Sequence, residues 1–350
     1  MSGSQDAGRE LRVAVAGTGA FGRNHLRVYR ELAAAGVKLV AAIEPDAARA
    51  AEAAEHYGIA VFASVEAALA ADLHLDAASV AVPTIHHHAV ASQLLQAGVD
   101  CLVEKPLAAK LAEADDLLML AERHGRILQP GHLERFNPAV LATEPAVKRP
   151  MFFEAHRLSV FTPRALDVDV VLDLMIHDLD IVLTFARSPV REVRAVGLPI
   201  LSPKVDIANV RVEFESGCVA NFTASRVSTE RVRKLRYFDQ RQYVSLDYAR
   251  RDVLVIRVAE DFNLEQAMAS GAAGGFTDGL PGLSFTKLTV TPGEPLRLEL
   301  MAFLAAVRSR LQPRVTSRQG REALALALEI QRKMEAHAAG AGLGDFFSGV

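Results

Sequence analysis

A glutamate-lysine pair directly follows a predicted buried strand in the first half of the chain. The strand is predicted over residues 100–103, and Glu104-Lys105-Pro106 come immediately after it. Burying a lysine costs desolvation free energy unless its ammonium group has a partner or a chemical task. The Glu104-Lys105 pair is therefore a candidate functional feature.

A helix predicted over residues 169–186 carries ionisable residues among Val, Leu and Ile. Asp173, His177 and Asp180 are spaced i, i+4 and i+7 and share one helix face, whereas Asp178 is predicted to point away, to solvent. Two interpretations stay open from the residues alone: a structural His-Asp pair, and a site for proton transfer, since histidine titrates near neutrality. A metal site is the weaker alternative, because the stripe lacks further ligands.

A glycine-rich turn near the N-terminus has the spacing of a dinucleotide-binding loop. Gly17-Thr18-Gly19-Ala20-Phe21-Gly22 follows an apolar strand and opens a helical pattern. The first glycine permits a tight turn, the second lets backbone approach a pyrophosphate, and the third lets the helix pack closely. Glu44 ends the second predicted strand, where a carboxylate binds the ribose hydroxyls and repels a 2′-phosphate. This pattern predicts NAD as cofactor.

Three adjacent histidines follow the fourth predicted strand, after Pro83 and Thr84. Neighbours at a helix start point in different directions, and no Asp, Glu or Cys stands beside them at ligand spacing, so we predict no metal site. The simpler interpretation is that one histidine meets the cofactor and the others are solvated.

The elements that must position these residues change character near residue 133. Between residues 11 and 132, strand-like runs alternate with amphipathic helices, which predicts a Rossmann doubly wound parallel sheet. Its strands are predicted at 11–16, 38–43, 60–62, 77–82, 100–103 and 126–129.

From 133 to 350 the period-two pattern predicts an α+β domain with a large, mostly antiparallel open sheet. Its strands are predicted at 152–160, 190–201, 209–214, 218–225, 234–238, 243–247 and 253–258. Two C-terminal helices, 296–310 and 318–337, are expected to pack back on one of the sheets, and residues 1–10 to be disordered. The exposed face of the large sheet predicts a homo-oligomer, a dimer or tetramer.

Composition excludes several classes of protein. The 350 residues are 50% hydrophobic with a net charge of −3, and there is no Trp and no long basic run, which argues against nucleic-acid binding. No apolar run is long enough to span a membrane. Cys101 and Cys218 lack a C-x-x-C spacing, as is typical of buried thiols in a reducing compartment. We therefore expect a soluble cytoplasmic protein.

Five motifs in order along the chain resemble the glucose-fructose oxidoreductase, inositol dehydrogenase and rhizopine-catabolism (Gfo/Idh/MocA) family. They are 17–22, Pro83-Thr84 with His87, 104–106, 135–138, and Asp173 with His177. The resemblance covers nearly the whole length and implies an NAD-dependent dehydrogenase that oxidises a secondary hydroxyl of a sugar.

The resemblance also implies roles for individual residues. Catalysis is assigned to Lys105, Asp173 and His177, with either His177 or Lys105 as the proton acceptor. The cofactor-binding residues that it implies are Gly17, Gly19, Ala20, Phe21, Gly22, Glu44, Pro83, Thr84, His87, Glu104 and Lys105.

Segments 131–138, 176–180 and 224–228 are most similar to nucleotide-sugar members of the family, which oxidise C3 of UDP-N-acetylglucosamine to a 3-keto sugar. Arginine forks suit its diphosphate. The substrate-binding residues predicted on this basis are Arg135, Phe136, Asn137, Arg157, Arg164 and Arg226.

Two alternatives remain: a dehydrogenase of a free polyol or sugar, which needs no arginines, and a sensor that binds cofactor and sugar without catalysis. The presence of Lys105 and His177 argues against the sensor.

Overall fold

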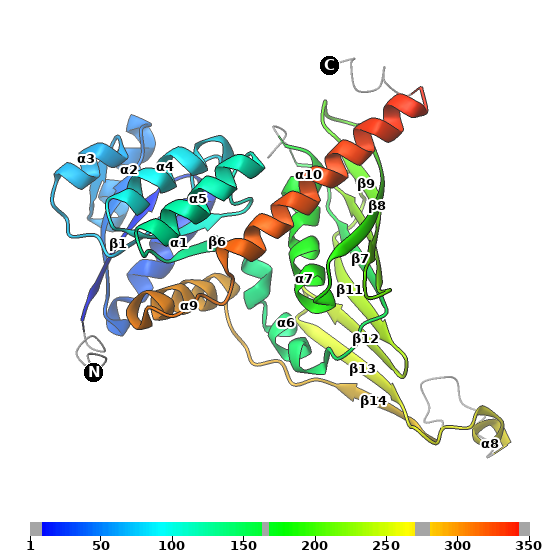
Figure 1. The fold of residues 1–350 in the computed structure, drawn as a ribbon. Coiled ribbons are helices and arrows are strands. Elements are labelled where there is room, and N and C mark those ends of the chain that lie inside the picture. The colour runs from blue at the N-terminus through cyan, green and yellow to red at the C-terminus, as the bar shows by residue number, and fades with distance from the viewer. Residues whose placement is uncertain (1–8, 163–167, 270–280, 343–350) are drawn as a thin grey trace. The chain divides into compact units, whose positions relative to one another are not determined.

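The structure is a computed structural model that describes residues 9–162, 168–269 and 281–342 (Figure 1). The chain forms two compact units, one of residues up to Phe136 with Glu294–Ala325, the other of Asn137–Gly293 with the residues from Leu326 onward. The sequence predicted a boundary after residue 132, with the C-terminal helices packing back on one of the sheets. The first unit extends to Phe136 and takes in Glu294–Ala325.

The first unit is built on a six-stranded parallel sheet with the order β3-β2-β1-β4-β5-β6. This is the order of a dinucleotide-binding Rossmann fold, so the predicted fold class is confirmed. The strands are β1 (Leu11–Ala16), β2 (Val37–Ile43), β3 (Ala60–Phe62), β4 (Ala77–Val80), β5 (Asp100–Glu104) and β6 (Leu128–Gly131).

Five helices connect these strands: α1 (Ala20–Glu31), α2 (Ala47–Tyr57), α3 (Val65–Ala70), α4 (His87–Gln96) and α5 (Leu111–Arg123). A sixth, α9 (Pro295–Ser309), comes from the C-terminal part of the chain. Tyr29 of α1 and Phe303 of α9 are fully buried in one cluster with Val13 and Val15 of β1. The apolar stripe of α9 therefore completes the core of the first unit.

The second unit is built on an eight-stranded sheet with the order β14-β13-β12-β11-β7-β10-β9-β8. Only β7 and β10 pair in parallel; the other neighbours are antiparallel, as predicted. The strands are β7 (Phe152–Leu158), β8 (Val190–Leu198), β9 (Ile207–Phe214), β10 (Val219–Ser225), β11 (Val232–Asp239), β12 (Gln242–Asp247), β13 (Asp252–Val258) and β14 (Leu283–Lys287). The short edge strand β14 was not predicted.

Helices cover one face of this sheet (Figure 1). They are α6 (Pro138–Thr143), α7 (Ile176–Ala186) and the part of α10 (Ser317–Gly340) that belongs to the second unit; α8 (Leu264–Ala269) lies apart, between β13 and β14. Gly197 of β8 leaves the space that Met334 of α10 fills, since a Cβ atom on Gly197 would lie 2.5 Å from the Met334 sulfur.

The helix predicted over 169–186 begins with a turn of π-helix, Val171–Met175, and continues as α7. The Asp169 carboxylate accepts hydrogen bonds from the backbone N–H groups of Val171 (2.9 Å) and Leu172 (3.1 Å) and so caps its start. Single π turns occur frequently at functional sites, and this one carries Asp173.

No helix among the described residues is long and apolar enough to cross a membrane. Cys101 and Cys218 are both buried and free of disulfides.

Candidate functional site

The glycine turn after β1 has the shape that the sequence predicted. Gly17 has φ +89°, and a Cβ atom there would lie 2.7 Å from the Ala81 carbonyl oxygen; on Gly22 it would lie 1.9 Å from the Gly17 carbonyl oxygen. A Cβ atom on Gly19, in contrast, would meet nothing within 4 Å. The turn is thus closed by Gly17 and Gly22 and open at Gly19, where α1 begins without a side-chain cap. Its first N–H groups suit a pyrophosphate.

Glu44 is held beside this turn. One carboxylate oxygen accepts hydrogen bonds from the backbone N–H and hydroxyl of Thr18, both at 2.9 Å, and the other from Asp46 N–H and the Arg49 guanidinium, both at 3.0 Å. Burial alone would raise the pKa of Glu44, but these hydrogen bonds outweigh it and lower the pKa. The carboxylate is therefore charged at neutral pH and suited to accept hydrogen bonds from a ribose diol.

Glu104 ends β5 in a site shaped around its side chain. It is 8% exposed, and its Oε1 lies 3.0 Å from Nε2 of the fully buried His25 on α1. A Cβ atom on Gly131 of β6 would lie 2.9 Å from the Glu104 carboxyl group, so a larger residue there would have to displace that side chain. Sequence reasoning missed His25, although its spacing of four from buried Tyr29 marks it as an inward-facing position.

His87 connects two cofactor-side turns. Its Nδ1 lies 2.8 Å from the Pro106 carbonyl oxygen and its Nε2 lies 2.9 Å from that of Val82, and burial lowers its pKa. The ring is buried, so its observed contacts are with the protein. Its neighbour His88 lies 2.7 Å from Asp116.

Lys105 follows Glu104 at the carboxyl end of β5 and is half-buried. The backbone N–H of Lys105 donates to Glu104 Oε2 at 3.3 Å. Pro83 and Thr84 follow β4 at the same edge, where Thr84 opens the 3₁₀ turn Thr84–His86. The cofactor-side residues that the sequence singled out therefore come together at the carboxyl ends of β1, β2, β4 and β5. This edge is where ligands bind in such sheets.

The 135–137 motif is divided between the units. Arg135 and Phe136 are buried in the first unit, in the 3₁₀ turn Leu133–Phe136. Asn137 is in the second, where its Oδ1 accepts from Ala139 N–H and its Nδ2 donates to the Tyr248 carbonyl oxygen at 3.1 Å. Their assignment to substrate stays a prediction, as does that of Arg164, which lies outside the described residues.

Asp173 and His177 are half-buried on the π turn and the first turn of α7. The prediction that Asp178 faces solvent is wrong, because it is 2% exposed and binds Arg157. The sequence pattern of the helix does not show this partner, because Arg157 is 21 residues away in the sequence.

Arg157 and Arg226, both predicted to bind substrate, each bind a buried carboxylate. Arg226 donates to Asp206 from Nε (2.7 Å), to the Val168 carbonyl from Nη1 (2.9 Å) and to Ser202 Oγ from Nη2 (2.9 Å). With all three nitrogens engaged, its geometry does not support a diphosphate contact.

Asp206 is fully buried and was also missed from the sequence. Burial alone would raise the pKa of its carboxyl group, but hydrogen bonds from Ser202, Arg226 and two backbone amides hold that pKa well below its usual range. The network fixes residue 168, just before the capped start of the helix that carries Asp173.

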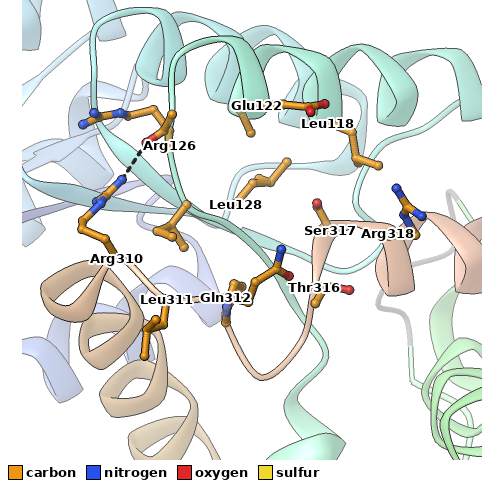
Figure 2. A pocket seen from close by; sticks show the side chains of 14 residues that line it. Leu118, Glu122, Arg126, Leu128, Arg310, Leu311, Gln312, Thr316, Ser317 and Arg318 are labelled. Atoms are coloured by element: carbon orange, nitrogen blue, oxygen red, sulfur yellow. Dashed lines mark hydrogen bonds between the residues drawn. The ribbon is translucent and has the colours of Figure 1, made fainter.

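The first unit also has a cavity of about 650 Å³ at the opposite end of its strands (Figure 2). Leu128 begins β6 on its floor, and Arg310 donates to the Gly125 carbonyl oxygen at 2.7 Å on its wall. Because cofactors bind at the carboxyl ends of parallel strands, this cavity is separate from the candidate site.

Comparison with family models gives two matches. Residues 11–132 match the oxidoreductase family with an NAD-binding Rossmann fold, and residues 148–243 match the GFO/IDH/MocA C-terminal domain.

Comparison with known proteins points the same way. The chain is 35% identical to UDP-N-acetylglucosamine 3-dehydrogenase from Acidithiobacillus ferrooxidans, over 93% of this chain and 98% of that protein. A solved structure of that enzyme superimposes on this chain with a TM-score of 0.82, over 93% of this chain and 98% of that one. An inositol 2-dehydrogenase from Corynebacterium glutamicum is 32% identical over 56% of this chain and 58% of its own length.

Proposed function

Because this chain belongs to the Gfo/Idh/MocA family of NAD-binding oxidoreductases, we propose that it oxidises the C3 hydroxyl of UDP-N-acetylglucosamine to a ketone. The observation that carries the proposal is the 35% identity to a UDP-N-acetylglucosamine 3-dehydrogenase over almost the full length of both proteins. Inositol dehydrogenases are the second candidate class, but the match covers only 56% of this chain.

The residues at the glycine turn fit NAD. Gly19 leaves open space where the pyrophosphate approaches, α1 has no acidic residue in its first turn, and Glu44 carries a charge for the ribose hydroxyls. When bound, NAD supplies the hydride acceptor for oxidation of the alcohol.

Oxidising a secondary alcohol requires a base for the hydroxyl proton. In our proposal His177 accepts this proton. Lys105 donates a hydrogen bond to the same oxygen and stabilises its developing negative charge, and Asp173 favours the charged form of His177. The alternative is that Lys105 takes the proton.

The diphosphate needs cationic groups other than Arg226. Arg233 of β11 pairs directly with Arg157 of β7. It is two residues before buried Leu235 and four before buried Tyr237, so the three side chains share a face of the sheet. Arg233 itself is exposed. Residues directly opposite in an antiparallel pair share a face, which places Arg233 on the helix-covered face of the sheet. We propose Arg233 of the second unit as a diphosphate-binding residue, and the assignment of Arg164 to the diphosphate is kept as a proposal.

The test is NADH formation with UDP-N-acetylglucosamine, free N-acetylglucosamine and myo-inositol at equal concentrations. The proposal expects turnover of the UDP-sugar and little turnover of the other two. Turnover of myo-inositol without turnover of the UDP-sugar would contradict the proposed nucleotide-sugar substrate and identify a polyol dehydrogenase. Binding of NAD and a sugar without NADH formation from any substrate would favour the sensor.

We also propose a cytoplasmic homo-oligomer, a dimer or tetramer, that assembles through the large sheet. The two free cysteines support a reducing compartment. The assembly is supported by the position of the helices on one face of the sheet, since a broad half-apolar face needs covering. Light scattering coupled to size-exclusion chromatography tests the oligomeric state directly.

A further inference from the structure

We propose that the buried Arg157–Asp178 ion pair is a positioning device that fixes the rotation of α7 and thereby the direction of the His177 side chain. This inference rests on the proposed function, because it assigns the pair to catalysis through His177. It also changes the predicted role of Arg157, from binding the substrate to orienting the helix that carries the base.

The pair has the geometry of a rigid link between the sheet and the helix. Arg157 of β7 donates from Nε to Asp178 Oδ2 at 2.7 Å and from Nη2 to Oδ1 at 3.0 Å, and both side chains are 3% exposed. A bidentate contact of a planar guanidinium fixes direction as well as distance. Asp178 therefore has one allowed orientation toward β7.

The guanidinium is itself held in place. It lies over the Tyr248 ring, 5.0 Å from the ring centre. The Tyr248 carbonyl oxygen accepts a hydrogen bond from Nδ2 of Asn137, the N-cap residue of α6. Arg157 is thus fixed on two sides, by a carboxylate and by an aromatic ring, so α7 is anchored to a rigid point.

Packing alone sets the rotation of α7 weakly. The helix buries Ile176, Leu179, Ile181, Val182 and Phe185. Hydrophobic contacts are non-directional, and a helix that is apolar around much of its circumference has no sharp polar boundary to fix which side faces inward. The ion pair adds a directional contact at the residue next to His177.

Stability is a poor explanation for the pair. Replacing a buried ion pair by apolar residues of similar volume is often neutral or stabilising, whereas removing one partner leaves a costly buried charge. A leucine at position 178 would match the apolar side chains that α7 buries. The need to orient the His177 side chain accounts for the charged residues Arg157 and Asp178 at these buried positions.

The test replaces both charges at once, with Arg157→Met and Asp178→Leu together, to avoid a stranded charge. We expect the melting temperature and the Kd for NAD to stay close to those of the wild type. We expect kcat to fall about 10- to 100-fold, as small misplacements of catalytic groups do, with less than about a threefold change in KM for UDP-N-acetylglucosamine. The matched control is Arg321→Met with Asp115→Leu, which removes a half-exposed pair in the first unit.

Two results would overturn the inference. An unchanged kcat in a folded double variant would show that the pair does not orient His177. A rise in KM with kcat unchanged would return Arg157 to substrate binding. If the double variant does not fold, Arg157→Lys takes its place: it keeps the charge but loses the fork, and we expect the same fall in kcat, reduced in size.

A measurement without substrate separates this inference from the proposed function. In histidine-labelled protein the His177 ring resonance, assigned with His177→Gln, should shift in the double variant and stay in place in the control. An unmoved resonance would refute the positioning role even in an active enzyme. A shifted resonance in a protein inactive on every sugar would refute the proposed function and leave the positioning intact.

Discussion

The glycine turn of the first unit and the π turn with α7 of the second hold functional groups in different ways. At the glycine turn the ligand-binding groups are backbone N–H groups and one carboxylate, and sterics at Gly17 and Gly22 fix their geometry. On α7 the functional groups are side chains, and buried ion pairs from distant strands fix the geometry. The first arrangement has no room for an added atom at Gly17 or Gly22. The second tolerates changes of volume but not loss of a charge.

Removing the proposed base should produce the largest effect, because transfer of the hydroxyl proton is part of the chemical step. His177→Ala and Lys105→Ala should each lower kcat by about two to four orders of magnitude while the Kd for NAD stays nearly unchanged, and Asp173→Asn should do less harm. Steady-state kinetics and NAD titration measure this. Near-normal turnover of His177→Ala would leave Lys105 as the proton acceptor.

Breaking a buried ion pair on one side should cost stability. Arg226→Ala leaves the Asp206 carboxylate buried, and removal of one partner from such a pair costs roughly 3–5 kcal/mol. The lower end is expected, since Asp206 keeps its bonds to Ser202 and three backbone amides. Arg194→Ala, which removes the exposed partner of Glu192, should leave the free energy of unfolding nearly unchanged in the same denaturant titration.

Adding a single methyl group should separate the glycines of the turn. Gly22→Ala forces a Cβ atom against the Gly17 carbonyl, so we expect a loss of about 1–3 kcal/mol in the free energy of unfolding together with weaker NAD binding. Gly19→Ala meets no protein atom within 4 Å and should weaken NAD binding with little loss of stability. Equal losses of stability in the two variants would contradict this division of roles.

The smallest effect concerns cofactor choice. Glu44→Ala should relax the preference for NAD over NADP, by about tenfold or less, because it removes the charge that repels a 2′-phosphate and releases Arg49, which binds Glu44 at 3.0 Å. The ratio of kcat/KM for the two cofactors measures this. Arg49→Ala should leave the NAD preference in place, and a wild-type preference for NADP would overturn the role of Glu44.

The same contrast explains how much could be predicted from the sequence. The Rossmann sheet, the glycine turn and Glu44 follow from local patterns, since strand alternation and glycine spacing are set by neighbours in the chain. The roles of Asp178, Asp206 and His25 did not follow, because their partners are between 20 and 79 residues away. Two of the arginines predicted to hold phosphate, Arg157 and Arg226, bind buried carboxylates. The sequence alone could not show whether each arginine binds a ligand phosphate or a buried carboxylate of the protein.

The central claim is that hydride leaves C3 of a UDP-linked N-acetylglucosamine. UDP-N-acetylglucosamine that carries deuterium only at C3 tests it most directly, because the fate of that atom identifies the reacting carbon. Mass spectrometry should find the deuterium in the NADH formed, and the nucleotide sugar should lose it. NADH formed without deuterium, while the sugar keeps its label, would contradict the account and place the oxidation at another carbon.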